Sequence, residues 1–183
     1  MTVGATILWH DYETTGRDTR YARPLQFACQ RTTLDLTPVG EPSVLHCDLP
    51  DDILPEPEAC LVTGVGPTEI RARARDSKGR PVRELSFLCS VLTELAAPNT
   101  CGAGYNSFEF DDEITRFALW RCLLPVYDRE WKNGNSRWDL IDPLRAAHAL
   151  RPDGFVWPSS EEGVPSFRLE RLAAANGLQH EAH

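Results

Sequence analysis

The stretch "ILWHDYETTG" at residues 7–16 places an apolar run directly before two carboxylates, Asp11 and Glu13. The apolar residues 7–9 predict a buried strand, since strands that cross a core are rich in branched and aromatic side chains. Side chains two apart on a strand share a face, so Asp11 and Glu13 should project together. Carboxylates that close raise each other's pKa unless a cation lies between them. The strand end is therefore either a solvated pair of acids or a site for a hard divalent ion such as Mg²⁺ or Mn²⁺.

Length and composition limit the class of protein. The 183 residues are 42% hydrophobic and 25% charged, which predicts one globular domain over residues 1–183. No apolar segment approaches the ~20 residues of a membrane span, and no signal peptide is visible. The six cysteines form no C-x-x-C pair, which disfavours zinc and favours reduced thiols in the cytoplasm.

The net charge of −8 argues against a nucleic-acid partner, because such partners favour basic surfaces. Charge placement matters more than the total, however. Acidic residues gathered around metal ions would lower the net charge and still serve a polyanionic substrate.

The order of strand and helix signals predicts an α/β fold. Three strands close together in sequence suggest an antiparallel meander with a turn at residues 37–40. Pro81 suits the first turn of the second helix, Pro143 should start or kink its helix, and Ser166 and Gly177 should cap and stop the last one. The expected strands are residues 6–11, 24–36, 43–49 and 100–106, and the expected helices are 66–75, 81–95, 110–124, 136–150 and 165–177. Together they predict a mixed sheet flanked by helices.

A second acidic cluster lies in "YNSFEFDDEITR", where residues 111–113 head a predicted helix. Acids are favoured there by the helix dipole alone. Alternatively, Asp111 follows an aromatic anchor, Phe110, and points into the same site as Asp11. His180 and His183 lie at the end of the chain, where a histidine is usually solvated.

Six blocks in order resemble the exodeoxyribonuclease I family, which belongs to the DEDDh 3′→5′ exonucleases. They are "HDYETTG", "RPLQFACQRT", "VTGVGPTEIRAR", "GYNSFEFDDEITR", "NSRWDLIDPLRAAHALRP" and "GVPSFRLERLAAANGL". The resemblance covers nearly the whole chain and implies an RNase H-like fold. It makes Asp11 and Glu13 the first motif, Asp111 the second, and His183 the general base of an H-x-x-x-x-D motif.

The sequence departs from the family at its end. The aspartate expected five residues after His183 has no counterpart here, nor do the later parts of the domain and the two domains that follow it in the family. The expected fold therefore lacks the C-terminal part of the exonuclease domain. In a two-metal site, Asp11 would bridge the ions while Glu13 and Asp111 each hold one. With one ligand missing, the second ion would be poorly held.

Substrate contacts are expected outside the carboxylates, although Glu13 belongs to both sets. Arg168 follows the Ser166 cap and could bind a phosphate, or it could be an ordinary surface arginine. A mixed set of cations and aromatic rings suits single-stranded DNA, although such aromatics more often belong to a core or an interface. The set comprises Arg116, Tyr127, Trp131 and Arg145.

Two functions from different classes follow. The first is a metal-dependent exonuclease that degrades single-stranded DNA to 5′-mononucleotides in repair or recombination. The second is a catalytically impaired fragment that binds single-stranded DNA or a protein. An RNA-trimming or proofreading relative is a third reading, which the blocks "NSRWDLIDPLRA" and "GVPSFRLE" disfavour. The resemblance also implies a partner, the single-stranded DNA-binding protein.

Overall fold

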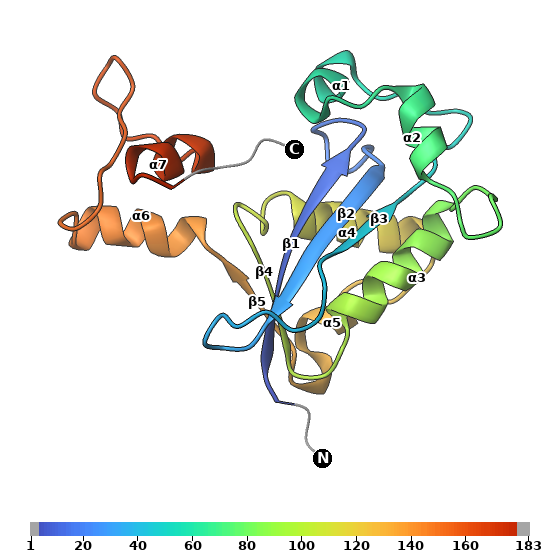
Figure 1. Cartoon of the computed structure of the whole chain (residues 1–183), viewed down its shortest axis with the longest axis horizontal. Helices are drawn as coiled ribbons and strands as arrows, with labels where there is room; N and C mark the ends of the chain where they lie inside the picture. Colours follow the sequence, from blue (N-terminus) through green and yellow to red (C-terminus); the bar gives the residue numbers. More distant parts are fainter. Residues whose placement is uncertain (1–3, 179–183) are drawn as a thin grey trace. The chain divides into compact units, whose positions relative to one another are not determined.

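The computed structural model describes residues 4–178, and its central strand is β1 (Thr6–Thr14), which contains residues 7–14 of the opening stretch. The five-stranded sheet has the order β3-β2-β1-β4-β5 (Figure 1). β1 pairs with β2 (Pro24–Thr32) in antiparallel fashion, and β2 pairs likewise with β3 (Ser43–His46). β4 (Thr100–Gly104) runs parallel to β1, so the sheet is mixed, as predicted.

The chain divides into two compact units, residues 1–138 and 139–183. A single exonuclease domain over the whole chain stays a prediction.

No helix within residues 4–178 is long and apolar enough to cross a membrane. The remaining elements are α1 (Pro57–Thr63), α2 (Pro67–Arg73), α3 (Glu84–Leu95), α4 (Asp111–Arg121), α5 (Asp128–Trp131), the 3₁₀ turn η1 (Lys132–Gly134), β5 (Ser136–Asp139), α6 (Ile141–Leu150) and α7 (Leu169–Ala175).

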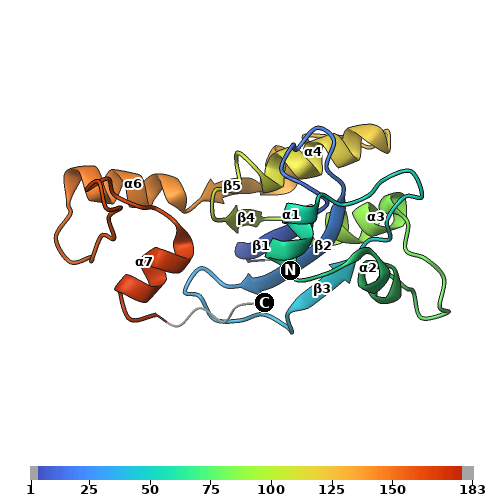
Figure 2. The same cartoon turned by 90° about the horizontal axis from the view of Figure 1, so that it is seen from above.

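The core of the first unit lies on one face of β1 and β2. Leu8 and Tyr12 of β1 point into it beside Phe27 of β2, whereas Asp11 is exposed and Glu13 half-buried on the alternate positions. This is the two-residue period expected of a strand with one buried face. Two helices cover that face (Figure 2), and their buried residues are Phe87, Leu88, Val91 and Leu95 of α3 and Ile114, Ala118 and Leu119 of α4.

Several boundaries differ from the prediction. Pro81 does not start α3: it pairs with Arg75 across a loop in which Asp76 accepts hydrogen bonds from the amides of Lys78 and Arg80. These local bonds compete successfully with helix formation. The strand expected over 24–36 ends at Thr32, because the chain turns back after it with a bond from Thr33 N to the Thr37 carbonyl (2.9 Å).

Four short elements, α1, α5, η1 and β5, were not predicted. The helix α1 was missed, and the helix expected over 136–150 is instead the strand β5 followed by α6, with Pro143 in the first turn of α6. The Asp139 carboxylate accepts a bond from the amide of Ile141 (3.1 Å) and so starts that helix.

Half-buried aromatic rings pack together in the second unit. His148 of α6 meets Trp157 and Phe167 edge to face, with ring centroids 5.0 and 5.6 Å apart. The start of α7 differs from the prediction. Ser166 provides no cap, and Arg168 itself occupies the N-cap position of a helix that begins at Leu169. Gly177 has φ 72° just after the helix, as expected of a stop.

A pair of leucines on α3 tests the assignment of the core. Leu88 is 0% exposed and Leu85 is 51% exposed. We expect Leu88→Ala to lower the free energy of unfolding by roughly 2–5 kcal/mol, because it removes buried apolar area and leaves a cavity. Leu85→Ala, measured in the same urea titration, should cost well under half of that. Equal losses for the two variants would show that the buried face of α3 is wrongly assigned.

Candidate active site

The predicted metal ligands Asp11 and Asp111 approach each other where β1 extends past its neighbour β4. The parallel pairing of β1 with β4 ends at Trp9, opposite Ala103. Farther along β1, the amide of Tyr12 donates a hydrogen bond to Oδ1 of Asp111, the first residue of α4, over 3.1 Å. A buried backbone N–H must find an acceptor. Here the acceptor is a carboxylate, and the bond brings the head of α4 to the residue beside Asp11.

Glycine allows the chain to make this approach. A Cβ at Gly104, the last residue of β4, would lie 2.8 Å from Cβ of Ser107 and 3.1 Å from the carbonyl oxygen of His10. Only glycine avoids those contacts without a shift of the backbone. The carbonyl of Ser107 then accepts the amide of Asp112 (2.8 Å), which fixes the first turn of α4. The short loop from β4 to α4 thus delivers Asp111 to β1.

Asp111 lies in an environment that disfavours its charged form. It is 2% exposed, and burial raises its pKa well above the ordinary value, with a further rise from the negative charge of Asp11. Asp11 is exposed on the adjacent strand. A hard cation between the two carboxylates would relieve both the repulsion and the cost of burial. The pair therefore fits a divalent metal ion such as Mg²⁺ or Mn²⁺.

Glu13 lies in the same cleft as Asp11. The cleft has a volume of about 430 Å³ and is formed by the end of β1, the loop after it, α1 and Phe110. Glu56 and Glu58 add two further acids to its wall. Among residues 4–178, no three acidic, histidine or cysteine side chains are close enough together to form a metal cage. The structure brings Asp11 close to Asp111 and places Glu13 near Asp11, but the described residues do not form a ready three-ligand site.

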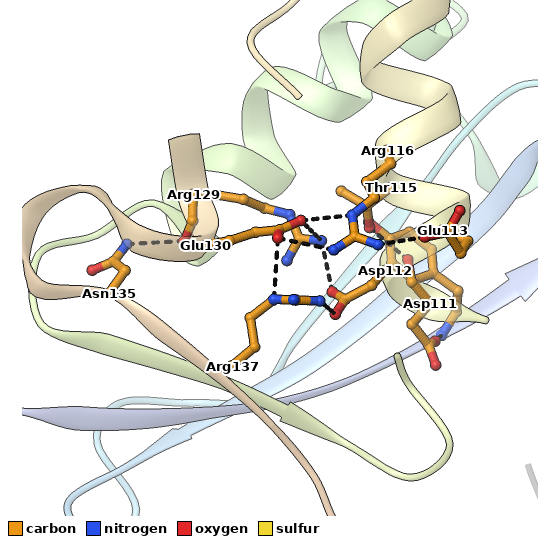
Figure 3. Close-up of polar contacts among 10 residues, drawn as sticks. Asp111, Asp112, Glu113, Thr115, Arg116, Arg129, Glu130, Asn135 and Arg137 are labelled. Atoms are coloured by element: carbon orange, nitrogen blue, oxygen red, sulfur yellow. Dashed lines mark hydrogen bonds and ion pairs between the residues drawn. The ribbon is translucent and has the colours of Figure 1, made fainter. Parts of the chain in front are cut away.

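The neighbour of Asp111 has the opposite orientation. Figure 3 shows Asp112 turned toward Arg129 and Arg137, with Asp111 turned away from them. Nη2 of Arg129 lies 2.6 Å from Oδ1 of Asp112, and Nη1 of Arg137 lies 2.5 Å from Oδ2. The hydrogen bonds and positive charges of the two arginines outweigh burial and hold the pKa of the Asp112 carboxyl below its usual range. The two consecutive aspartates therefore differ in their partners. Asp112 is neutralised by two arginines, whereas Asp111 lies near Asp11, where a cation fits.

The ion pairs continue through Glu130 into a connected network. Glu130 accepts bonds from Nε and Nη2 of Arg116 (2.8 and 2.9 Å) and pairs with Nε of Arg137 (3.1 Å). Arg116 also pairs with Glu113, one turn along α4. Three arginines and three carboxylates therefore join α4, α5 and β5 (Figure 3). We call these six residues the arginine–carboxylate network; they are Asp112, Glu113, Arg116, Arg129, Glu130 and Arg137.

The predicted substrate contacts are divided between the two units. Arg116 is engaged within the network, and its guanidinium lies 5.4 Å from the centre of the Tyr127 ring. Tyr127 and Trp131 are 58% and 63% exposed, so their rings are accessible. Arg145 and Arg168 are exposed in the second unit. His183 lies outside the described residues, and its role as general base stays a prediction.

Sequence reasoning missed the network and part of the cleft. Arg129 and Arg137 lie 17 and 25 residues from Asp112 and belong to no local pattern with it. Glu56 directly precedes the short helix α1, which was not predicted, and Glu58 lies in its first turn. A signal did exist for the network, because "FDDEITR" contains an acid with no evident function beside the one assigned to the metal.

Removal of one buried partner tests the network. The side chain of Arg129 is 1% exposed, and Arg129→Met would leave Asp112 with one of its two cations. We expect a loss of roughly 3 kcal/mol in the free energy of unfolding, since an uncompensated buried charge is costly. Arg145→Met is the control, because Arg145 is half-exposed and 3.6 Å from Asp142, and such surface pairs contribute about 0–1 kcal/mol. Two small and equal effects would contradict the network's contribution to stability.

Asp111 should weaken the metal-free protein. A raised pKa in the folded state means that the folded carboxylate is penalised at pH values above the ordinary aspartate pKa of about 4. Asp111→Asn keeps an acceptor for the Tyr12 amide and removes the charge. We expect the variant to melt above the wild type in EDTA at pH 7, by a margin that shrinks as the pH falls toward 4. Asp52→Asn, at an exposed position, should melt with the wild type throughout. A destabilised Asp111→Asn at pH 7 would contradict the electrostatic account.

Comparison with known proteins identifies relatives over nearly the whole chain. The family model described as Exonuclease matches residues 8–183. Exodeoxyribonuclease I of Escherichia coli K12 is 44% identical over 96% of this chain, and that of Haemophilus influenzae is 45% identical over 94%. The chain spans about 36% and 35% of the lengths of these two relatives.

Solved structures share the fold. Exonuclease I from Methylocaldum szegediense superimposes with a TM-score of 0.89 at 49% identity, over 98% of this chain and 37% of that one. E. coli exonuclease I with a dA16 oligonucleotide gives 0.89 at 44% identity, over 97% and 37%. An ExoI/SSB-Ct complex gives 0.91 at 44% identity, over 98% and 38%. The predicted RNase H-like fold and the resemblance to exodeoxyribonuclease I are confirmed, and the chain belongs to the exonuclease family.

Proposed function

We propose that this chain is a metal-dependent 3′→5′ exonuclease unit that removes 5′-mononucleotides from single-stranded DNA in repair or recombination. The observation that carries the proposal is the bond from the Tyr12 amide to Asp111, which holds a buried carboxylate beside the exposed Asp11. Without a cation this arrangement is unfavourable on both counts, burial and repulsion. Family membership supplies the reaction class in which such a pair is useful.

Asp11 and Asp111 would hold the metal ion, with Glu13 approaching from the cleft wall. A divalent ion, Mg²⁺ or Mn²⁺, supplies charge that stabilises the attacking and leaving oxygens of the phosphodiester. The protein residues have other tasks. Asp111 must lose its proton for the ion to bind, so binding should strengthen as the pH rises. The neutral imidazole of His183 would take a proton from the attacking water.

The proposed substrate and partner are supported by the solved relatives and by exposed aromatic rings of this chain. Solved relatives carry the dA16 oligonucleotide and SSB-Ct, which supports single-stranded DNA and the single-stranded DNA-binding protein as partners here. Tyr127 and Trp131 present exposed rings, and Nζ of Lys132 lies 5.7 Å from the centre of the Trp131 ring. Bases stack on such rings while nearby cations meet phosphates. Arg145 and Arg168 would add phosphate contacts.

Metal-dependent cleavage tests the proposal. A 5′-labelled single-stranded oligonucleotide should shorten from its 3′ end in Mg²⁺ or Mn²⁺ and remain intact in EDTA. Asp11→Asn should slow cleavage by about 10²–10³, the usual cost of losing one preorganised electrostatic contact. The same variant should show a clear loss of Mn²⁺ binding heat in calorimetry.

The control is Asp153→Asn, at an exposed position in the second unit, which should cut at the wild-type rate. An RNA oligonucleotide of the same sequence distinguishes a DNA enzyme from an RNA-trimming one. Binding of the DNA with no cleavage in either metal would favour the alternative function, a binding fragment. Equal turnover by wild type and Asp11→Asn would show that the site is wrongly assigned.

A further inference from the structure

The charge of the cleft poses a problem for its proposed substrate. Four acids line it, namely Asp11, Glu13, Glu56 and Glu58, and Arg17 is the only basic residue among the described residues that form its wall. A DNA strand brings further negative charge into this space. Metal bound at Asp11 and Asp111 would offset part of the repulsion at the reacting phosphate, but it leaves Glu56 and Glu58 uncompensated.

Arg17 has a fixed backbone and an available side chain. Just before it, Oγ1 of Thr14 donates to the carbonyl of Gly16 (2.7 Å), and the Thr15 carbonyl accepts the amide of Glu56 (2.7 Å). A Cβ at Gly16 would lie 2.3 Å from Oε1 of Glu56, so the loop packs directly against the residue that precedes α1. The guanidinium of Arg17 is exposed and forms no ion pair within residues 4–178.

We propose that Arg17 is the residue that grips a backbone phosphate of the DNA strand in this cleft and thereby sets affinity at the 3′ end. A guanidinium can offer two parallel N–H donors to one phosphate, which suits an arginine better than a lysine. An arginine already paired with a carboxylate would have to exchange partners first. Arg116 is in that position, whereas Arg17 is not. This inference rests on the proposed function, because it assumes that a nucleic-acid strand enters the cleft.

The test is equilibrium binding of a fluorescent single-stranded oligonucleotide in EDTA, where no cleavage interferes, at several salt concentrations. Arg17→Ala should weaken binding about tenfold, the usual worth of a hydrogen-bonded charge contact. It should also reduce the slope of log affinity against log salt by about 0.7, the value of one phosphate contact on a single strand. Arg17→Lys should keep the slope and lose part of the affinity.

Arg20→Ala is the matched control. Arg20 lies exposed in the same loop and does not line the cleft, and it is the backbone carbonyl of Arg20 that accepts a bond from Arg121. This control should bind like the wild type. In Mg²⁺, Arg17→Ala should raise KM about tenfold with kcat within twofold.

Equal affinities and equal slopes for Arg17→Ala and Arg20→Ala would overturn the assignment, as would a wild type that does not bind the strand at all. A wild type that binds without cutting would overturn the proposed exonuclease function alone, since the affinities would still decide the role of Arg17.

Discussion

One hydrogen bond, from the Tyr12 amide to the Asp111 carboxylate, joins the central strand to the head of α4 and holds Asp111 near Asp11. β4 stops pairing with β1 at Trp9, which leaves a buried amide in need of an acceptor. The acceptor comes from the first residue of α4, and so a requirement of the backbone places a negative charge beside Asp11. Removal of that acceptor would separate α4 from the central strand and would move the proposed metal ligand Asp111 away from Asp11.

The fold directs the neighbouring acids Asp111 and Asp112 into two different electrostatic environments. Asp112 faces arginines in a buried, neutral arrangement, and Asp111 faces the strand that carries Asp11. The close approach of Gly104 to Ser107 and the bond from the Asp112 amide to the Ser107 carbonyl fix the entry to α4, and with it the separate directions of the two aspartates. Rigidity at this point is what a site for a small hard cation requires, since misplaced ligands bind it poorly.

Much of this could be predicted from local sequence. The apolar run in "ILWHDYETTG" correctly predicted a strand, and the two-residue spacing predicted that Asp11 and Glu13 project from one face of it. The helix over α3 followed from its leucine spacing, although Pro81 was misread because the competing loop around Asp76 depends on side-chain bonds. Strand β5 was hidden within a helical pattern, since "SRWD" reads as a strand only when its sheet neighbour is known. The partners of Asp112 were not predictable for the same reason: no local rule links residues so far apart in the chain.

The arginine–carboxylate network also limits which substitutions its six positions can accept during evolution. Its three cations and three anions balance, Asp112 and Arg129 are buried, and the other four are half-buried. A substitution that removed one of these charges would leave its partner without an opposite charge, and a second substitution would be needed to restore the balance. These six positions should therefore vary together or not at all among related chains, as co-varying contacts do. Such a balanced set would be a more discriminating family signature than the proposed metal ligands, because many unrelated nucleases need paired carboxylates but not this arrangement of arginines.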